Sequence, residues 1–357
     1  MSSEPKNGEH SVRPKRVSTK NLNRLSFAGA ALTLGGIALF SYFVYSVGLD
    51  EIIANIRQFG IAGFAVILGL YAVRILIRAY AWSLSVYDPY ELSVRDTAPA
   101  VVIGEAMSSM IPLGILISGT SKAIAVRNRV PLVVGFSSIA TENLFYSFTT
   151  SVFLILGAFT FVRSFDLEAG TALTIDLMIV FLFVAVLFLF LMILRQWHFA
   201  SETCEWLYQK GILKSILERG RLQVRLFENF VYGFYRRHPG RFLPIIMLEA
   251  AFHLLGVFEV WFVLSRITEM GSSVLNAFML ESVSRLITIV FKLVPFLIGV
   301  DEAGAEFIVK TAAMGVGVGV SLAIIRKGRI LFWAMVGLIL IITRGLSLRK
   351  ILRAVND

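Results

Sequence analysis

The chain has 357 residues, of which 57% are hydrophobic and only 16% are charged, so a soluble globular protein is excluded and an all-α polytopic membrane protein is indicated. The single cysteine, Cys204, excludes an intrachain disulfide framework. The net charge of +10 does not predict nucleic-acid binding, because Lys and Arg gather in the N-terminal tail, one long loop and the C-terminus, as on the cytoplasmic face of a membrane protein.

The N-terminal region predicts a tail followed by the start of a transmembrane domain. Residues 1–26 are polar and basic, so we expect a disordered cytoplasmic tail before a membrane domain over residues 27–347. Phe27–Leu49 is an uncharged run with roughly the ~20 residues that a helix needs to cross a bilayer. The run is too long for a signal-peptide core, and we expect an uncleaved first helix.

The second predicted helix, Ile61–Val86, follows a short amphipathic connector over Gly48–Gly60. It carries Arg74 and Arg78 one turn apart. Two interpretations are equally open: the arginines snorkel to the cytoplasmic interface, or they line a cavity.

The rest of the chain alternates apolar segments with polar loops. Ala98–Ser118 is apolar but is interrupted by Pro112, and Arg195–Arg241 is the only long hydrophilic loop. Residues 348–357 are expected to form a cytoplasmic C-terminus. Further membrane segments are predicted at Pro131–Val162, Leu173–Leu194, Phe242–Leu264, Leu275–Val294, Ala305–Ile325 and Ile330–Ile342.

The distribution of basic residues predicts the topology. The tail, the 195–241 loop and the C-terminus are all basic, so each pair should be separated by an even number of crossings in the cell membrane. This holds if 98–118 is re-entrant from the cytoplasmic side, which gives about eight spanning helices plus one or two re-entrant or broken segments, with a possible internal pseudo-repeat. A re-entrant 305–325 would instead move the C-terminus outside, and we rank that lower.

Two interrupted segments predict a transport site. Pro112 to Lys122 and Pro295 to Gly304 place Pro and Gly within apolar sequence, with Gly119, Gly299 and the carboxylates Asp301 and Glu302 among them. Lipid satisfies neither freed backbone groups nor charge, so such segments line a cavity. Interrupted segments in comparable places of two halves indicate a binding site.

Polar stripes on two helices point toward the same region. Glu281, Arg285, Thr288 and Lys292 share one helical face before Pro295, and Glu281 and Arg285 have the spacing of an i,i+4 ion pair. This stripe is either a structural ion pair or part of the site, and Lys292, with no local partner, suits an anionic head group. Ser138, Glu142, Tyr146 and Thr149 form a second stripe.

Other chemistry is not predicted. Glu249 and His253 are four residues apart and are expected to form a structural hydrogen-bonded pair rather than a metal site. Nucleotide-binding motifs are missing, so we expect no cofactor and no ATP-driven transport by this chain alone. The alternation of Gly and Val over residues 315–319 is expected to serve close helix packing.

The interrupted segments carry a resemblance to a known family. The sequence resembles the lysylphosphatidylglycerol synthase transmembrane-region family in Val294-Pro295, Gly299-Val300, Glu302-Ala303-Gly304 and the later Arg329. A second match is Ile111-Pro112 with Gly119, Lys122 and the Glu142 of the next helix, although Gly119-Thr120 stands where the family commonly has Gly-Glu. The resemblance covers roughly residues 20–345.

The resemblance implies movement of a lipid between leaflets, without aminoacyl transfer, because the chain carries no synthase domain. We therefore expect a flippase for a lipid with a polar head group, either an anionic or an aminoacylated phospholipid. We do not expect the chain to be an enzyme. Two alternatives stay open: an accessory subunit that docks lipid-synthesis enzymes on its basic loop, and a membrane enzyme acting on a lipid-linked substrate. The expected substrate-binding residues are Arg74, Arg78, Lys122, Glu142, Arg285, Lys292, Asp301, Glu302 and Arg329.

Overall fold

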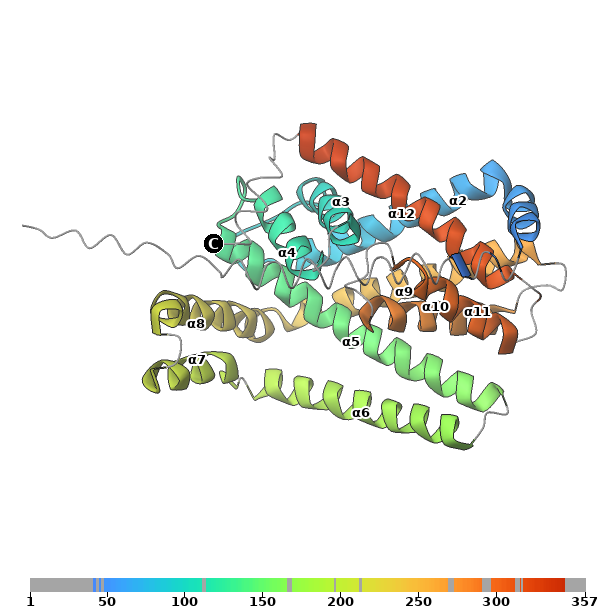
Figure 1. Ribbon diagram of the computed structural model, residues 1–357. Coiled ribbons are helices and arrows are strands. Elements are labelled where there is room, and N and C mark those ends of the chain that lie inside the picture. The colour runs from blue at the N-terminus through green and yellow to red at the C-terminus, as the bar shows by residue number, and fades with distance from the viewer. Residues whose placement is uncertain are drawn as a thin grey trace, which may run out of the picture.

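The computed structural model is all-helical over the residues that it describes (Figure 1). These residues are 48–110, 114–165, 169–195, 197–211, 214–268, 273–290, 297–311 and 317–343, with the single residues 41, 42, 45 and 315. The predicted polytopic helical class is therefore confirmed. The predicted first helix, Phe27–Leu49, lies almost wholly outside the described residues.

The helices follow one another with short connections. Gly60 adopts φ 68° inside the first long helix and divides it into an amphipathic arm and a membrane-spanning part, as the sequence predicts. The elements are α2 (Leu49–Leu84), α3 (Val94–Met110), α4 (Gly114–Ala125), α5 (Leu132–Ser164), α6 (Ala169–Leu194), α7 (Phe199–Gln209), α8 (Lys214–Arg237), the 3-10 turn η1 (Pro239–Arg241), α9 (Phe242–Ile267), α10 (Val274–Val290), α11 (Val300–Thr311) and α12 (Val318–Thr343).

The fold contains two copies of one arrangement, in which a helical hairpin lies between two long helices. The first copy is α2, the hairpin α3–α4, and α5; the second is α9, the hairpin α10–α11, and α12. Both α4 and α11 have 12 residues, a length of about 18 Å that does not reach across the ~30 Å hydrocarbon core. Neither of these two helices is long enough to cross the hydrocarbon core by itself, and the expected pseudo-repeat is present.

The hairpin α3–α4 enters and leaves at the end of the molecule that carries the basic loop. Arg129, just after α4, lies 3.2 Å from Asp96 at the start of α3. The ring of Tyr87, just before α3, contacts that of Phe230 on α8 at 5.5 Å between centroids. Both ends of this hairpin therefore lie at the same end of the molecule, which a re-entrant 98–118 requires.

The hairpin α10–α11 enters from the opposite end (Figure 1). Phe307, near the end of α11, contacts Phe161 at the far end of α5, with 6.0 Å between ring centroids. The two hairpins therefore reach inward from opposite ends, as expected for an inverted repeat. Along the chain, α5 and α6 lie between the first hairpin and the basic loop, and α9 and α12 follow that loop.

The prediction of separate segments at Ala305–Ile325 and Ile330–Ile342 is wrong. One continuous helix, α12, covers Val318–Thr343, and Ala305 lies in α11. The sequence suggested a break because Arg326, Lys327 and Arg329 interrupt the apolar run. In the structure Arg326 and Arg329 are buried and ion-paired, so the helix continues through them.

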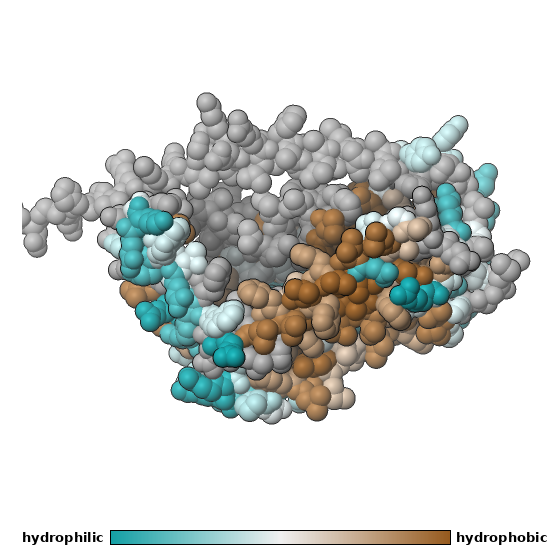
Figure 2. All heavy atoms as spheres, turned by 90° about the horizontal axis from the view of Figure 1, so that it is seen from below, coloured by the Kyte–Doolittle hydropathy of each residue, from teal (hydrophilic) through white to brown (hydrophobic). Residues whose placement is uncertain are grey.

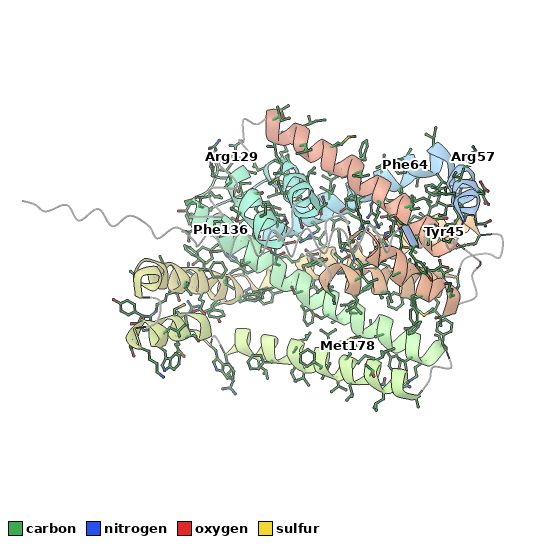
Figure 3. All side chains as sticks on the ribbon, viewed as in Figure 1. Tyr45, Arg57, Phe64, Arg129, Phe136 and Met178 are labelled. Carbon is green, nitrogen blue, oxygen red and sulfur yellow. The ribbon has the colours of Figure 1, made fainter. Side chains whose placement is uncertain are left out.

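The outer surface is apolar between two polar ends. In the described chain, α2, α5 and the helix ending at Ile267 are long and apolar enough to cross a membrane, and 172–188 is a shorter apolar stretch. Phe181 on α6 is 73% exposed. Exposure of such an apolar ring is unfavourable in water but not in lipid. Apolar residues fill the middle of one face (Figure 2), and Arg129 and Arg57 lie at opposite ends, with Met178 between them (Figure 3).

The arrangement of the hairpins predicts which positions can be labelled from which side. In a Cys204→Ser background, Arg129→Cys should react with an impermeant maleimide from the side on which native Cys204 reacts, and Lys310→Cys from the other side. Both positions are exposed, at 68% and 71%. Sealed vesicles with reagent on one side make the measurement. Labelling of both variants from one side would contradict the inverted arrangement.

Gly319 should tolerate no side chain. A Cβ there would lie 2.7 Å from the backbone of Ala305 and Glu306, where α11 crosses α12. Gly319→Ala should lower the free energy of unfolding by about 1–3 kcal/mol, because backbone atoms have to move apart. Thermal unfolding in detergent measures this loss. Gly69→Ala, where a Cβ meets nothing within 4 Å, is the matched control and should cause no loss.

Candidate functional site

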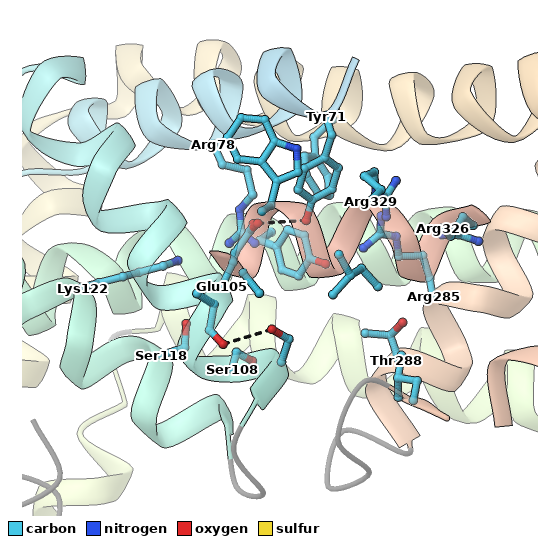
Figure 4. Close-up of a pocket in the computed structure, with 18 of the residues that line it drawn as sticks. Tyr71, Arg78, Glu105, Ser108, Ser118, Lys122, Arg285, Thr288, Arg326 and Arg329 are labelled. Atoms are coloured by element: carbon cyan, nitrogen blue, oxygen red, sulfur yellow. Dashed lines mark hydrogen bonds between the residues drawn. The ribbon is translucent and has the colours of Figure 1, made fainter. Parts of the chain in front are cut away.

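A polar cavity of about 270 Å³ lies between the two halves of the fold (Figure 4). Its walls come from α2, α3, α4 and α5 of the first half and from α9, α10, α12 and the start of α11 of the second. Five cationic side chains and two carboxylates line it: Arg78, Lys122, Arg285, Arg326, Arg329, Glu105 and Asp301. The lining therefore has a formal charge of +3, the excess of five cations over two anions.

Described residues next to the turns of both hairpins line this cavity. Ser108 and Ser109 lie in the last turn of α3 in the first hairpin, and Leu297 precedes α11 in the second. Gly299 has φ 84°, a conformation that side chains disfavour, and its N–H donates to Glu302 Oε2 at 2.8 Å. This turn allows α11 to begin beside the cavity, with Asp301 on the wall.

Glu281 on α10 is the centre of a buried ion cluster. It accepts hydrogen bonds from Arg285 at 2.8 and 3.0 Å and from Arg326 at 2.9 Å, and Arg74 Nη2 lies 3.5 Å away. The predicted i,i+4 pair between Glu281 and Arg285 is therefore present. Each cation comes from a different helix, so this one carboxylate ties α2, α10 and α12 together.

Glu259 on α9 completes this cluster from the other side. It binds Arg74 at 3.1 Å and also binds Arg329. Arg74 and Glu259 are fully buried, so they belong to the wall behind the cavity. Gly256 leaves the room that the cluster needs, because a Cβ there would lie 2.4 Å from Glu281 Oε1.

A second ion pair holds Arg78 at the cavity wall. Glu142 on α5 accepts two hydrogen bonds from its guanidinium, at 2.5 and 3.1 Å. Aromatic rings fix the planes of the arginines: Arg78 lies 4.3 Å above Tyr146, and Arg329 lies 4.2 Å above Tyr71. These stacking contacts orient the guanidinium groups without using up their hydrogen-bond donors.

Lys122 differs from the arginines because its ammonium group forms no hydrogen bond or ion pair with any residue that the structure describes. It extends from α4 into the cavity, and its exposed fraction is only 6% (Figure 4). Gly104 on α3 makes this path possible, because a Cβ there would lie 2.7 Å from Lys122 Cγ. A buried cation without a bound carboxylate favours an anionic ligand.

A carboxylate with an aromatic partner lies on α3, beside the helix that carries Lys122. Glu105 Oε2 accepts a hydrogen bond from the Tyr71 hydroxyl at 2.9 Å, and the ring of Tyr71 contacts that of Trp333 at 6.2 Å between centroids. Asp301 accepts a bond from the Ser284 hydroxyl at 3.3 Å, which itself accepts one from Arg326 at 2.7 Å. The cavity therefore offers acceptors as well as cations.

The structure brings most of the predicted site residues together. Arg78, Lys122, Arg285, Asp301, Arg329 and Gly119 line the cavity, while Arg74 and Glu142 stand directly behind it. The arginines on α2 do not snorkel, because Arg74 is buried against Glu259 and Arg78, only 11% exposed, is bound to Glu142.

Three groups of predicted residues lie elsewhere. Glu302 is not on the wall: it binds Lys327 at 2.5 Å and fixes the start of α11. Gly304 packs against Ile287 of α10. Lys292, Pro295 and Pro112 lie outside the described residues.

Sequence analysis missed Arg326 as a site residue and predicted one pair wrongly. Arg326 and Arg329 are three residues apart and share a helical face. This spacing was not considered, because the predicted membrane segments ended at Ile325 and began again at Ile330. The expected bond between Glu249 and His253 is absent: His253 Nε2 lies 3.0 Å from the Thr150 hydroxyl on α5. No group of His, Cys, Asp and Glu side chains with metal-binding geometry occurs within the described ranges.

Comparison with known proteins gives one match. The family described as "Lysylphosphatidylglycerol synthase TM region" matches residues 26–339, which include every residue that lines the cavity. No curated protein and no solved structure matches the chain.

Removal of the central carboxylate should destabilise the protein strongly. Glu281→Gln leaves three guanidinium groups in the protein interior with one negative charge fewer. We expect a loss of about 3–5 kcal/mol in the free energy of unfolding, as for other broken buried ion pairs. Arg129→Gln, which breaks an exposed pair, should cost less than about 1 kcal/mol. Unfolding in detergent measures both variants, and equal losses would contradict the assigned role of Glu281.

Proposed function

Because the chain belongs to the lysylphosphatidylglycerol synthase transmembrane-region family, we propose that it moves a lipid with an anionic or aminoacylated phosphate head group between the leaflets of the cell membrane. The family and the apolar helices make it a multi-pass membrane protein of lipid metabolism or transport. The proposal adds the activity, the head group and the place where that group binds.

The observation that carries the proposal is the unpaired Lys122 in a cavity whose lining has an excess of cations. A phosphate bound to Lys122 would also contact the guanidinium groups that stand around the same space. Arg78 keeps donors free when it is bound to Glu142, because a guanidinium has five. The head group would therefore replace water without requiring any ion pair to break.

The size of the cavity supports a head group rather than a whole lipid. About 270 Å³ lies just below the ~300–1,000 Å³ range of small-molecule sites, so it holds a phosphate with a small substituent. Acyl chains need no polar cavity and would stay in the bilayer. Glu105 with Tyr71 would accept the amino group of an aminoacylated head group.

The inverted hairpins support transport rather than binding alone. Broken helices that reach a midplane site from opposite sides are the arrangement through which transporters open alternately to each face. Movement of one half against the other would expose the cavity first to one leaflet and then to the second. The basic loop between α6 and α9 would place the α7–α8 end in the cytoplasm.

Replacement of Lys122 tests the proposal. Purified protein is placed in liposomes with head-group-labelled phosphatidylglycerol, and an impermeant quencher reports exchange between leaflets. Lys122→Met should slow exchange by roughly 10-fold or more, the effect of losing one charge-assisted hydrogen bond worth about 1.5–3 kcal/mol. Lys122→Arg should retain most of it.

The matched control is Lys310→Met, which removes an exposed cation outside the cavity and should exchange at the wild-type rate. Equal exchange by wild type and Lys122→Met would overturn the assignment of the site. No exchange of any phospholipid by wild type would overturn the proposed transport and favour the accessory role.

A further inference from the structure

The polar cavity is not closed on all sides, and Asn143 on α5 marks its opening. Among the described residues that line the cavity, Asn143 alone is exposed, and the others are buried or half-buried. Ile139 and Tyr146, about one turn away on either side, line the cavity with it. Phe136, two turns before Asn143, shares its helical face and is 37% exposed. Asn143 therefore lies at the border between the cavity wall and the outer surface of α5.

The two hairpins leave this part of α5 uncovered because each of them packs on a different stretch of that helix. Ala123 of α4 lies against Gly135, where an added Cβ would be 3.5 Å from the Cβ of Ala123. Ser282 of α10 lies against Gly157, where an added Cβ would collide with the Ser282 hydroxyl. Asn143 falls between these two contacts along α5, and its exposure shows that neither hairpin covers it. The opening therefore follows from hairpins that enter from opposite ends.

The surface around the opening is apolar, so it faces the bilayer rather than water. The opening lies on α5, one of the helices long and apolar enough to cross a membrane. Phe136 lies nearer than Asn143 to the start of this helix, Phe148 lies further along, and both rings are 37% exposed. On α10, Thr288 lines the cavity, and the next residue, Ile289, is 50% exposed. Lipid accommodates exposed side chains of this kind, and water does not.

We propose that the cavity opens sideways into the bilayer through a mouth at Asn143, and that its ligand is a phospholipid within the membrane rather than a free phosphate compound. The phosphate of the lipid reaches Lys122 through this mouth, and the acyl chains stay outside α5. The inference rests on the proposed function, because the cations that line the cavity fit both kinds of anion equally well.

The side chain of Asn143 positions the lipid in this mouth. An amide that faces lipid lacks the hydrogen-bonding partners that water would supply, so it favours a polar ligand. A glycerophospholipid has its ester and phosphodiester oxygens at the junction between head group and acyl chains, which is the part that crosses the mouth. The amide N–H groups of Asn143 donate to these oxygens and hold the phosphate toward Lys122.

Photo-crosslinking tests the mouth directly. The photoreactive residue p-benzoylphenylalanine is placed at position 143 of the full-length protein, in liposomes with labelled phosphatidylglycerol or with labelled diacylglycerol, which has no phosphate. Phosphatidylglycerol should be captured roughly 10-fold more efficiently, the ratio that one charge-assisted hydrogen bond supports. The matched control places the same photoreactive residue at position 156, where Leu156 is 53% exposed outside the cavity and both lipids should be captured equally. Equal capture at position 143 would overturn the mouth.

A bulky side chain at the mouth should block transport. Asn143→Trp should abolish most of the exchange of head-group-labelled phosphatidylglycerol between leaflets, because the indole occupies the opening. Leu156→Trp adds the same ring at an exposed position of α5 outside the cavity and should exchange at the wild-type rate. Wild-type exchange by Asn143→Trp would overturn the mouth.

Two smaller changes separate the amide from the space that it occupies. Asn143→Gln keeps an amide and should retain exchange, whereas Asn143→Leu, with a side chain of similar size and no polar atom, should slow it. Equal exchange by these two variants would overturn the positioning role of Asn143.

The mouth and the proposed function fail in different ways. No exchange of any phospholipid by wild type would overturn the proposed transport, whereas preferential capture at position 143 would still establish the mouth. Slow exchange in Lys122→Met, with wild-type exchange in Asn143→Trp, would overturn the mouth and leave the head-group site in place. Binding of inorganic phosphate, without preferential capture of phosphatidylglycerol at position 143, would assign the cavity to a free phosphate compound and overturn the inference.

Discussion

The neutralisation of buried charge is the constraint on which the rest of this structure depends. An isolated guanidinium inside a membrane protein is costly, and here Arg74, Arg285, Arg326 and Arg329 are all taken into the interior. Glu281 and Glu259 make this arrangement stable by binding two or more of them each. These contacts join four helices from both halves, so the charges that would disrupt a membrane protein position its helices instead.

The same constraint accounts for the cavity. Arg78, Arg285, Arg326 and Arg329 are bound by carboxylates, Arg78 and Arg329 also stack on aromatic rings, and all four line one space. The short helices α4 and α11 end near this space, so their backbone polar groups border a polar cavity rather than lipid. An inverted repeat brings two such ends to the middle of the fold, and no single half would enclose the site.

The carboxyl groups around the cavity perform different tasks because their partners differ. Glu281 and Glu259 are saturated with guanidinium donors and act as fixed anions. Glu302 binds Lys327 and a backbone N–H, so its role is to hold the second hairpin. Glu249 is buried and has no hydrogen-bond partner among the described residues, and Glu105 accepts a hydrogen bond from a tyrosine hydroxyl. Sequence position alone would have assigned all of them to one class.

Local features of the sequence determined the structural class of this protein and one of its ion pairs. Apolar runs determined its membrane class, and the i,i+4 spacing determined the bond between Glu281 and Arg285, because these features act within a few turns of helix. Only the tertiary structure decided that Arg74 pairs with Glu259, 185 positions away, that His253 contacts Thr150 rather than Glu249, and that Lys122 stays unpaired among the described residues. Such contacts depend on which faces of distant helices pack together, and no periodicity within one helix encodes that choice.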